Sequence, residues 1–214
     1  MIIFQPDRIL MRNQIKKYAH YVKGDVLDVG AGPFDRYSDL FRFSKYIKLD
    51  PCPDNNPDIA ASAEKIPLGD NSVDSIVCTQ VLGDIWNLKG AISEFFRVLK
   101  SGGNVILTES LMAAMHDEPH DFWRFTDFSL RRLFEENGFD ILHIERRGGF
   151  FASTAQNIIR YFIDRLDLYK NFSGKILSPF ISAFGRLMLW LDRLDKSKAG
   201  MRQSMGWCVV AVKK

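Results

Sequence analysis

The feature that most constrains this 214-residue sequence is a short apolar strand that leads directly into a turn containing two glycines. Residues 26–29 are Val-Leu-Asp-Val, a run typical of a strand buried inside a sheet, and residues 30–33 are Gly-Ala-Gly-Pro. Glycine has no Cβ and tolerates positive φ, so such a turn lets the backbone approach a ligand closely. This pattern predicts a cofactor or nucleotide site at the end of a strand.

Short apolar runs alternate with helical patterns along most of the chain, which predicts an α/β sheet with helices on both faces. Turn signals and apolar periodicity give the boundaries of these elements. The expected strands are residues 26–29, 46–50, 58–60, 72–78, 104–108, 139–145 and 207–212. The expected helices are residues 7–23, a segment after the glycine turn that runs through residue 41, and residues 90–100 and 130–137.

Residues 150–205 break this alternation, because they hold helical patterns and no strand signal. We therefore divide the chain into a core of residues 1–149, a helical insertion of residues 150–205, and a final core strand in residues 206–214. Two apolar stripes run along the insertion. Two interpretations stay open: a lid or homodimer surface that buries the stripes, and a surface that docks peripherally on a membrane.

Charge and composition exclude some classes of function. The 29 basic residues exceed the 26 acidic residues only slightly and are scattered, which argues against a nucleic-acid partner. The three cysteines lie far apart without metal-binding spacing, so no metal site is predicted. Residues 1–4 are apolar, whereas a signal peptide needs an apolar core of roughly 7–15 residues. We expect a cytoplasmic protein, with peripheral contact to the inner face of the membrane as the alternative.

The second expected strand ends at Asp50, where a doubly wound sheet places a carboxylate that accepts hydrogen bonds from ribose hydroxyls. A dinucleotide enzyme would share this feature, but it needs a third glycine near position 35 for its pyrophosphate. This chain has Asp35 there. Asp35 and Asp28 would repel phosphate and suit a positively charged ligand, which counts against a nicotinamide-dependent oxidoreductase.

Six motifs follow one another in order: residues 26–32, 49–50, 63–68, 73–76, 79–82 and 96–103. Over roughly residues 23–139, they resemble the class I, type 11 methyltransferases. The resemblance implies a Rossmann-like sheet of seven mostly parallel strands, with an antiparallel last strand and S-adenosyl-L-methionine as the cofactor. It implies that the cofactor contacts Asp28, Gly30, Ala31, Gly32, Asp50, Pro51, Ala63, Glu64, Thr79 and Gln80.

Within that set, the resemblance places Asp28 and the two glycines at the methionine end, Asp50 at the ribose, Ala63 and Glu64 at the adenine, and Gln80 at the methyl site. The sequence departs from the family pattern twice. Ser62 stands where an acidic residue often contacts the adenine, and Gly83-Asp84 stands where relatives frequently carry Glu-His.

The loop of residues 116–126 follows the fifth expected strand, and therefore lies on the ligand side of an α/β sheet. An imidazole there can remove a proton from an acceptor near neutral pH, with a carboxylate to orient the ring. We predict His120, His116 and Asp121 as catalytic residues, and Trp123 and Arg124 as acceptor-binding residues. A purely structural role for the histidines is one alternative. A metal site of His116 and His120 with the neighbouring carboxylates is another, although the run lacks the helical His-x-x-x-His setting typical of such a site.

These observations predict a methyltransferase that acts on a small-molecule, saccharide or glycolipid acceptor, through O-methylation. The sugar assignment is an analogy, because similar His-Asp-Phe-Trp-Arg-Phe-Thr stretches occur in relatives associated with polysaccharide and lipid-glycan pathways. The alternative is a catalytically inactive module of the same fold that binds the cofactor and acts through its helical insertion.

Overall fold

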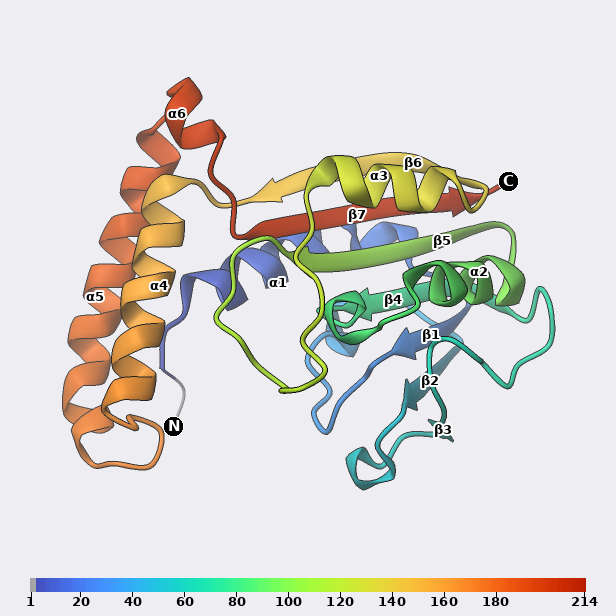
Figure 1. The fold of residues 1–214 in the computed structure, drawn as a ribbon, viewed down its shortest axis with the longest axis horizontal. Coiled ribbons are helices and arrows are strands. Elements are labelled where there is room, and N and C mark those ends of the chain that lie inside the picture. The colour runs from blue at the N-terminus through green and yellow to red at the C-terminus, as the bar shows by residue number, and fades with distance from the viewer. Residues whose placement is uncertain (1–2) are drawn as a thin grey trace.

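A computed structural model describes residues 3–214, so the first two residues of the apolar N-terminal run lie outside it. One sheet holds seven strands in the order β3-β2-β1-β4-β5-β7-β6 (Figure 1). The strands are β1 (Asp25–Val29), β2 (Lys45–Asp50), β3 (Ile59–Ala60), β4 (Val73–Thr79), β5 (Leu99–Ser110), β6 (Phe139–Arg147) and β7 (Gly206–Lys213). β7 pairs antiparallel with β5 and β6, and the other described pairs are parallel. The predicted fold class is confirmed.

Helices cover both faces of the sheet and bury a core on each side. Helix α1 (Pro6–Tyr18) packs on one face, and α2 (Leu88–Val98) and α3 (Asp127–Glu135) pack on the other (Figure 1). Side chains alternate across β1, so Val26 joins the core under α1 while Leu27 and Val29 join the core under α2 and α3. Burial on both faces explains why β1 is apolar at nearly every position.

Side-chain caps fix where the two helices on the second face begin. The Asn87 side chain accepts a hydrogen bond from the Gly90 amide at 3.0 Å, and Thr126 and Ser129 form a capping box at α3. Helix α2 ends at Val98, and β5 starts at the next residue, earlier than the expected strand of residues 104–108. β5 can start this early because its first residue, Leu99, pairs with Val73 of β4.

The prediction of a helix after the glycine turn is wrong. Residues 33–41 hold only a 3₁₀ turn at Ser38–Leu40. Local hydrogen bonds compete with helix formation here: the Asp35 carboxylate accepts from the Ser38 amide, and the Arg36 carbonyl accepts from the Arg12 guanidinium at 2.7 Å. The helix expected to start at Asp7 instead begins at Pro6 and ends in a 3₁₀ turn (Ala19–Tyr21).

Three helices lie between β6 and β7: α4 (Phe150–Arg165), α5 (Ser173–Leu194) and α6 (Lys198–Met201). The first two form an antiparallel hairpin at the end of the sheet to which the arrowheads of β1, β2 and β4 point (Figure 1). A third core joins the hairpin, with Ile159 and Ile163 of α4 packed against Ile181 and Phe184 of α5. In residues 3–214, none of the helices combines the length and apolarity that crossing a bilayer requires.

Candidate functional site

A cavity of about 1010 Å³ opens at the carboxyl ends of β1, β2 and β4. The strand order reverses between β1 and β4, and such a switch point is where open α/β sheets bind ligands. Nine of the residues predicted to contact the cofactor line this cavity: Gly30, Ala31, Gly32, Asp50, Pro51, Ala63, Glu64, Thr79 and Gln80. The tenth, Asp28, does not.

The glycine turn after β1 is held against β2 and kept open toward the cavity. The amides of Gly30 and Ala31 both donate to the Leu49 carbonyl, at 2.8 and 3.2 Å. Gly30 has a φ of +68°, and a Cβ on it would lie 2.3 Å from Cγ2 of Val81. Gly32 also has positive φ, but a Cβ there would meet nothing within 4 Å. The first glycine is therefore required by packing, while the second faces open space along the cavity wall.

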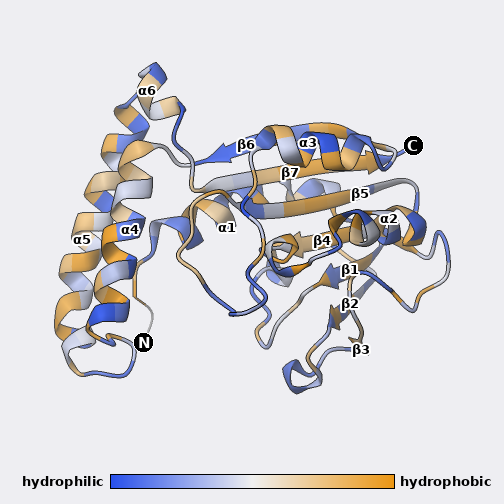
Figure 2. Cartoon of the chain, in the orientation of Figure 1, coloured by the Kyte–Doolittle hydropathy of each residue, from blue (hydrophilic) through white to orange (hydrophobic). Residues whose placement is uncertain are grey.

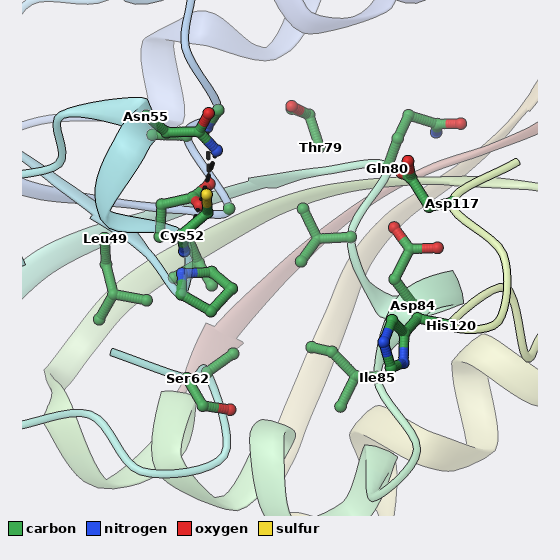
Figure 3. Close-up of a pocket in the computed structure, with 18 of the residues that line it drawn as sticks. Leu49, Cys52, Asn55, Ser62, Thr79, Gln80, Asp84, Ile85, Asp117 and His120 are labelled. Carbon is green, nitrogen blue, oxygen red and sulfur yellow. Dashed lines mark hydrogen bonds between the residues drawn. The ribbon is translucent and has the colours of Figure 1, made fainter. Parts of the chain in front are cut away.

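Asp50 organises the corner where β2 meets the glycine turn. Its side chain is buried, and Oδ2 accepts from the Gly32 amide at 2.9 Å. Oδ1 accepts from the Cys52 amide at 2.9 Å and from Nδ2 of Asn55 at 2.8 Å (Figure 3). One carboxylate therefore ties the glycine turn to the loop after β2, and places a negative charge at the cavity wall.

Asp28 is not among the residues that line the cavity, so its predicted contact with the cofactor stays a prediction. Successive side chains of a strand face opposite sides, and Val29 takes the position that lines the cavity. Asp28 instead accepts a hydrogen bond from the Tyr46 hydroxyl at 2.9 Å. Burial raises the pKa of this carboxyl to about 7, although the Tyr46 hydrogen bond opposes the rise. Asp35 also lies outside the cavity lining, so neither carboxylate supplies the negative surface expected beside the cofactor.

Gln80 follows β4 in a conformation that is uncommon for a residue other than glycine. Its φ is +60°, and its amide donates to the Thr108 carbonyl at 2.8 Å. Its side chain is also held in place, because Oε1 accepts from the Ser110 hydroxyl at 2.5 Å and Nε2 donates to Oγ1 of Thr108 at 3.3 Å. A left-handed backbone maintained by three hydrogen bonds at a ligand-binding edge is typical of a functional position.

A second group of side chains forms the other end of the cavity. Figure 3 shows Gln80, Asp84, Asp117 and His120 on one side, opposite Leu49, Cys52 and Asn55. Glu118, Trp86 and Phe122 also line this region. The predicted residue His120 thus reaches the cavity, whereas Asp84, Trp86 and Asp117 were not predicted. For Asp84, the sequence offered one signal: Gly83-Asp84 differs from the Glu-His that the family pattern frequently has at these positions.

The other two predicted catalytic residues, His116 and Asp121, stand behind the cavity wall rather than in it. The ring of His116 lies between two carboxylates, with Nε2 3.8 Å from Oδ1 of Asp84 and Nδ1 3.4 Å from Oδ2 of Asp121. Burial raises the pKa of Asp84, whose Oδ1 has no hydrogen-bond partner among the described residues, and the nearby His116 opposes that rise. Hydrogen bonds from Arg124 lower the pKa of Asp121 to about 2.

The predicted acceptor-binding residues Trp123 and Arg124 also lie outside this cavity. Nε1 of Trp123 donates to the Ile85 carbonyl at 2.9 Å, and its ring packs beside Trp86. Arg124 binds both oxygens of Asp121, at 2.5 and 2.8 Å. It also lines a separate groove of about 610 Å³ between α4 and residues 111–114. Both residues hold the loop of residues 116–126 from outside the cavity, because their polar atoms bind other groups of the protein.

Comparisons with known proteins agree with this geometry. Residues 27–107, from β1 into β5, match a family model described as a methyltransferase domain. None of the curated proteins compared with the chain matches it significantly.

Among solved structures, a SAM-dependent methyltransferase from Archaeoglobus fulgidus is 14% identical, with a TM-score of 0.59, over 96% of this chain and 94% of its own. Phosphoethanolamine N-methyltransferase 2 of Haemonchus contortus, in complex with S-adenosyl-L-methionine, is 18% identical, with a TM-score of 0.59. The match covers 95% of this chain but spans only about half, 52%, of the Haemonchus chain.

The cyclase SpnF is 17% identical with a TM-score of 0.60, over 97% of this chain and 81% of its own. A cyclase among the neighbours shows that the fold alone does not determine the reaction. The family match, by contrast, falls on most of the cavity lining, including the glycine turn, Asp50 and Gln80. Residues 27–107 are therefore similar in sequence to a methyltransferase domain, and the chain shares its fold with solved S-adenosyl-L-methionine-dependent methyltransferases.

Proposed function

We propose that the chain transfers a methyl group from S-adenosyl-L-methionine to a hydroxyl of a small acceptor, of which a saccharide or the sugar of a glycolipid is the best fit. The observation that carries the proposal is the continuity of the cavity. Its volume of about 1010 Å³ is at the upper end of the range for small-molecule sites, which leaves room for a cofactor and an acceptor together. Its two ends also differ in chemistry.

The first end suits the cofactor. Gly32 borders open space, so backbone can lie against a ligand there. Asp50 offers a carboxylate at the end of β2, the position that accepts ribose hydroxyls in doubly wound folds. Ala63 and Glu64 line the wall beyond it, where an adenine would fit. When bound, S-adenosyl-L-methionine supplies an electrophilic methyl group on a positively charged sulfur.

The second end suits a hydroxylated acceptor. Trp86 and Phe122 offer aromatic surfaces, and their rings are in edge-to-face contact with centroids 5.4 Å apart. Asp84, Asp117 and Glu118 offer carboxylates that can accept hydrogen bonds from several hydroxyls. Aromatic faces beside such acceptors are the surface that a sugar ring requires. Gln80 lies on the same side as Asp84 and Asp117 (Figure 3), with its side chain held by Ser110 and Thr108.

Asp84 is the residue that we assign to accept the proton of the acceptor hydroxyl. Asp84 lines the cavity, and its raised pKa makes it a stronger base than an exposed aspartate. His116 lies behind it and would stabilise Asp84 in position, while Asp121 orients the His116 ring. His120 lines the cavity, but the described residues give its ring no carboxylate partner. We therefore assign His120 to orienting the acceptor hydroxyl.

An amine acceptor is the second candidate, because three carboxylates at one end of the cavity would also attract a cation. The Haemonchus neighbour carries the name of an N-methyltransferase. A screen of hydroxylated sugars against primary and secondary amines, followed by release of S-adenosylhomocysteine, separates the two. Turnover with amines alone would replace the O-methylation proposal.

The direct test is calorimetric titration of S-adenosyl-L-methionine and S-adenosylhomocysteine into the wild type and two variants. Asp50→Ala removes the carboxylate that holds the glycine turn, and we expect affinity to fall at least about 100-fold, since about two hydrogen bonds to a charged group are lost. Asp54→Ala, an exposed residue of the same loop, is the control and should bind as the wild type does. If the wild type fails to bind either ligand, the proposed function is wrong. Binding without turnover on any acceptor would favour the inactive module.

A further inference from the structure

The helical hairpin carries a large apolar surface that the fold leaves uncovered. Helix α5 is the outermost element at its end of the molecule, and apolar residues recur along its whole length (Figure 2). One row of them points away from α4 and is exposed. The row consists of Ile176, Phe180, Ala183, Leu187, Trp190 and Leu194, and the large side chains in it are 52–70% exposed.

The spacing of this exposed row is regular. Its members follow one another at intervals of four and three residues, which keeps them on one narrow strip of an α-helix. The strip runs from Ile176 to Leu194, so at a rise of about 1.5 Å per residue it is about 27 Å long. The face toward α4 is separate, since Leu177, Ile181 and Phe184 pack against Ile159 and Ile163. Helix α5 therefore has two apolar faces, and the hairpin core uses only one. At the tip of the hairpin, Phe172 is 71% exposed and extends the strip.

The charges beside the strip all have the same sign. Lys175, Arg186 and Arg193 are exposed and lie 11 and 7 residues apart, so they form a basic row along one edge of the strip. The acidic residue of α5, Asp192, is used inside the fold, where its two oxygens accept from the amides of Gly149 and Ala152 at 2.9 and 3.1 Å. Directly after the helix, Asp195 accepts from the Ser197 amide at 2.8 Å, and three exposed basic residues follow: Lys196, Lys198 and Arg202.

Other acidic groups near the tip are also occupied. Asp164 accepts from Arg160 at 2.7 Å, and Asp167 lies 3.3 Å from Lys170. The free charge around the strip is therefore positive. A second copy of this chain is a poor occupant, because Arg186 lies near the middle of α5 and a two-fold antiparallel pairing would bring the two Arg186 side chains together. A negatively charged surface complements the row without that cost.

We infer that α5 docks in the plane of an anionic lipid bilayer, with its apolar strip in the acyl boundary and its basic row among the headgroups. A long amphipathic helix with Trp and Phe on its apolar face, and Lys and Arg beside it, has the composition of interfacial helices. The inference does not depend on the acceptor's identity.

Vesicle flotation of the full chain tests the inference. The probes are vesicles of phosphatidylcholine alone and vesicles with about 30 mol% phosphatidylglycerol, at low and high salt. We expect binding to the anionic vesicles that weakens as salt rises, because the basic row is exposed. The Lys175→Gln/Arg186→Gln/Arg193→Gln variant should bind about 100-fold more weakly, since each basic residue near an anionic surface contributes roughly a factor of five.

The apolar strip is tested separately with Phe180→Ser/Trp190→Ser, which should lower partitioning at least about tenfold. The matched control is Phe128→Ser/Leu142→Ser, which changes two exposed apolar residues on α3 and β6 and should bind as the wild type does. Retained cofactor affinity and helical circular dichroism show that each variant is folded. Failure of the wild type to float with anionic vesicles overturns the inference. The inference is also overturned if light scattering shows that the wild type is a dimer, the Phe180→Ser/Trp190→Ser variant is a monomer, and neither protein binds vesicles.

Discussion

Glu109, at the end of β5, is a buried carboxyl that supports the cavity without lining it. Its side chain is 2% exposed, and Oε1 accepts from the amides of Val81 and Leu82 at 3.0 and 2.7 Å. The two amides follow Gln80, so Glu109 holds the segment from which Gln80 and Asp84 enter the site. Burial raises the pKa of Glu109 to about 7, although the two amide hydrogen bonds oppose the rise.

A raised pKa at Glu109 predicts how stability depends on pH. The folded protein binds a proton here more tightly than the unfolded chain, so this stabilisation is complete below the unfolded pKa and is lost as pH rises through about 7. We expect the free energy of unfolding to fall between pH 5 and pH 8, by up to about 3 kcal/mol from this group. Glu109→Gln should reduce the slope in urea titrations without removing it, because burial also raises the pKa of Asp28 to about 7. The exposed control Glu135→Gln should keep the wild-type slope, and equal slopes in all three proteins would contradict the prediction.

At Asp84, the proposed base, replacement by asparagine should lower kcat by about 100-fold or more and leave the affinity for S-adenosyl-L-methionine nearly unchanged. His116→Ala should have a smaller effect on kcat, because His116 acts through Asp84. It should also move the acidic limb of the pH–rate profile to higher pH, since the His116 charge lowers the pKa of Asp84. Steady-state kinetics across pH check both, with His20→Ala as a control outside the cavity. If the acidic limb of the pH–rate profile does not move in His116→Ala, then His116 does not act through Asp84.

The residues expected to contact the cofactor line the cavity more often than those expected to contact the acceptor, for a physical reason. Gly30, Gly32, Asp50 and Gln80 stand at the ends of strands, and the order of parallel strands determines where such ends meet. Residues 111–126 form a loop without regular backbone hydrogen bonding, so side-chain pairs such as Asp121 with Arg124 determine which residues face the cavity. Spacing along the sequence does not specify those pairs.

At the scale of elements, the strands were predicted within a few residues, because apolar runs buried on both faces are unambiguous. The helix expected in residues 33–41 failed, because its periodicity was weak and the Asp35 side chain and Arg12 bind the backbone that a helix would use. Asp28 was assigned to the cofactor by resemblance. Its position in β1, one residue before Val29, turns it to the opposite face.

The start of β7 offers a sharp test of how closely these elements pack. A Cβ on Gly206 would lie 2.1 Å from the backbone oxygen of Glu109 in β5, and neither strand can move without disturbing the sheet. Gly206→Ala should therefore lower the free energy of unfolding by about 2–3 kcal/mol. Gly69→Ala, where a Cβ meets nothing within 4 Å, should change it by less than about 0.5 kcal/mol. Urea denaturation compares the two, and equal stability would show that the start of β7 adjusts freely.

At the scale of the whole molecule, one buried ion pair joins the N-terminal helix to the base of the hairpin. Arg147, at the end of β6, is fully buried, and its Nε donates to Oδ1 of Asp7 in α1 at 2.7 Å. Asp7→Ala would leave the guanidinium buried without this partner, so we expect a loss of about 3 kcal/mol in unfolding free energy. The exposed pair of Asp140 and Lys214 is the control, and Asp140→Ala should cost less than about 1 kcal/mol. Similar losses in thermal denaturation of both variants would contradict this account.

The position of β7 has a consequence for synthesis on the ribosome. β7 is the last strand in the chain, yet it lies inside the sheet, between β5 and β6. Until residues 206–213 have emerged, β6 lacks its partner, and the edge of β5 that faces β7 stays open. The hairpin helices, with their apolar surfaces, are translated before that gap closes. The nascent chain therefore exposes an unpaired strand edge and two helices with apolar surfaces at the same time. This combination favours binding to a chaperone or to a membrane surface before folding is complete.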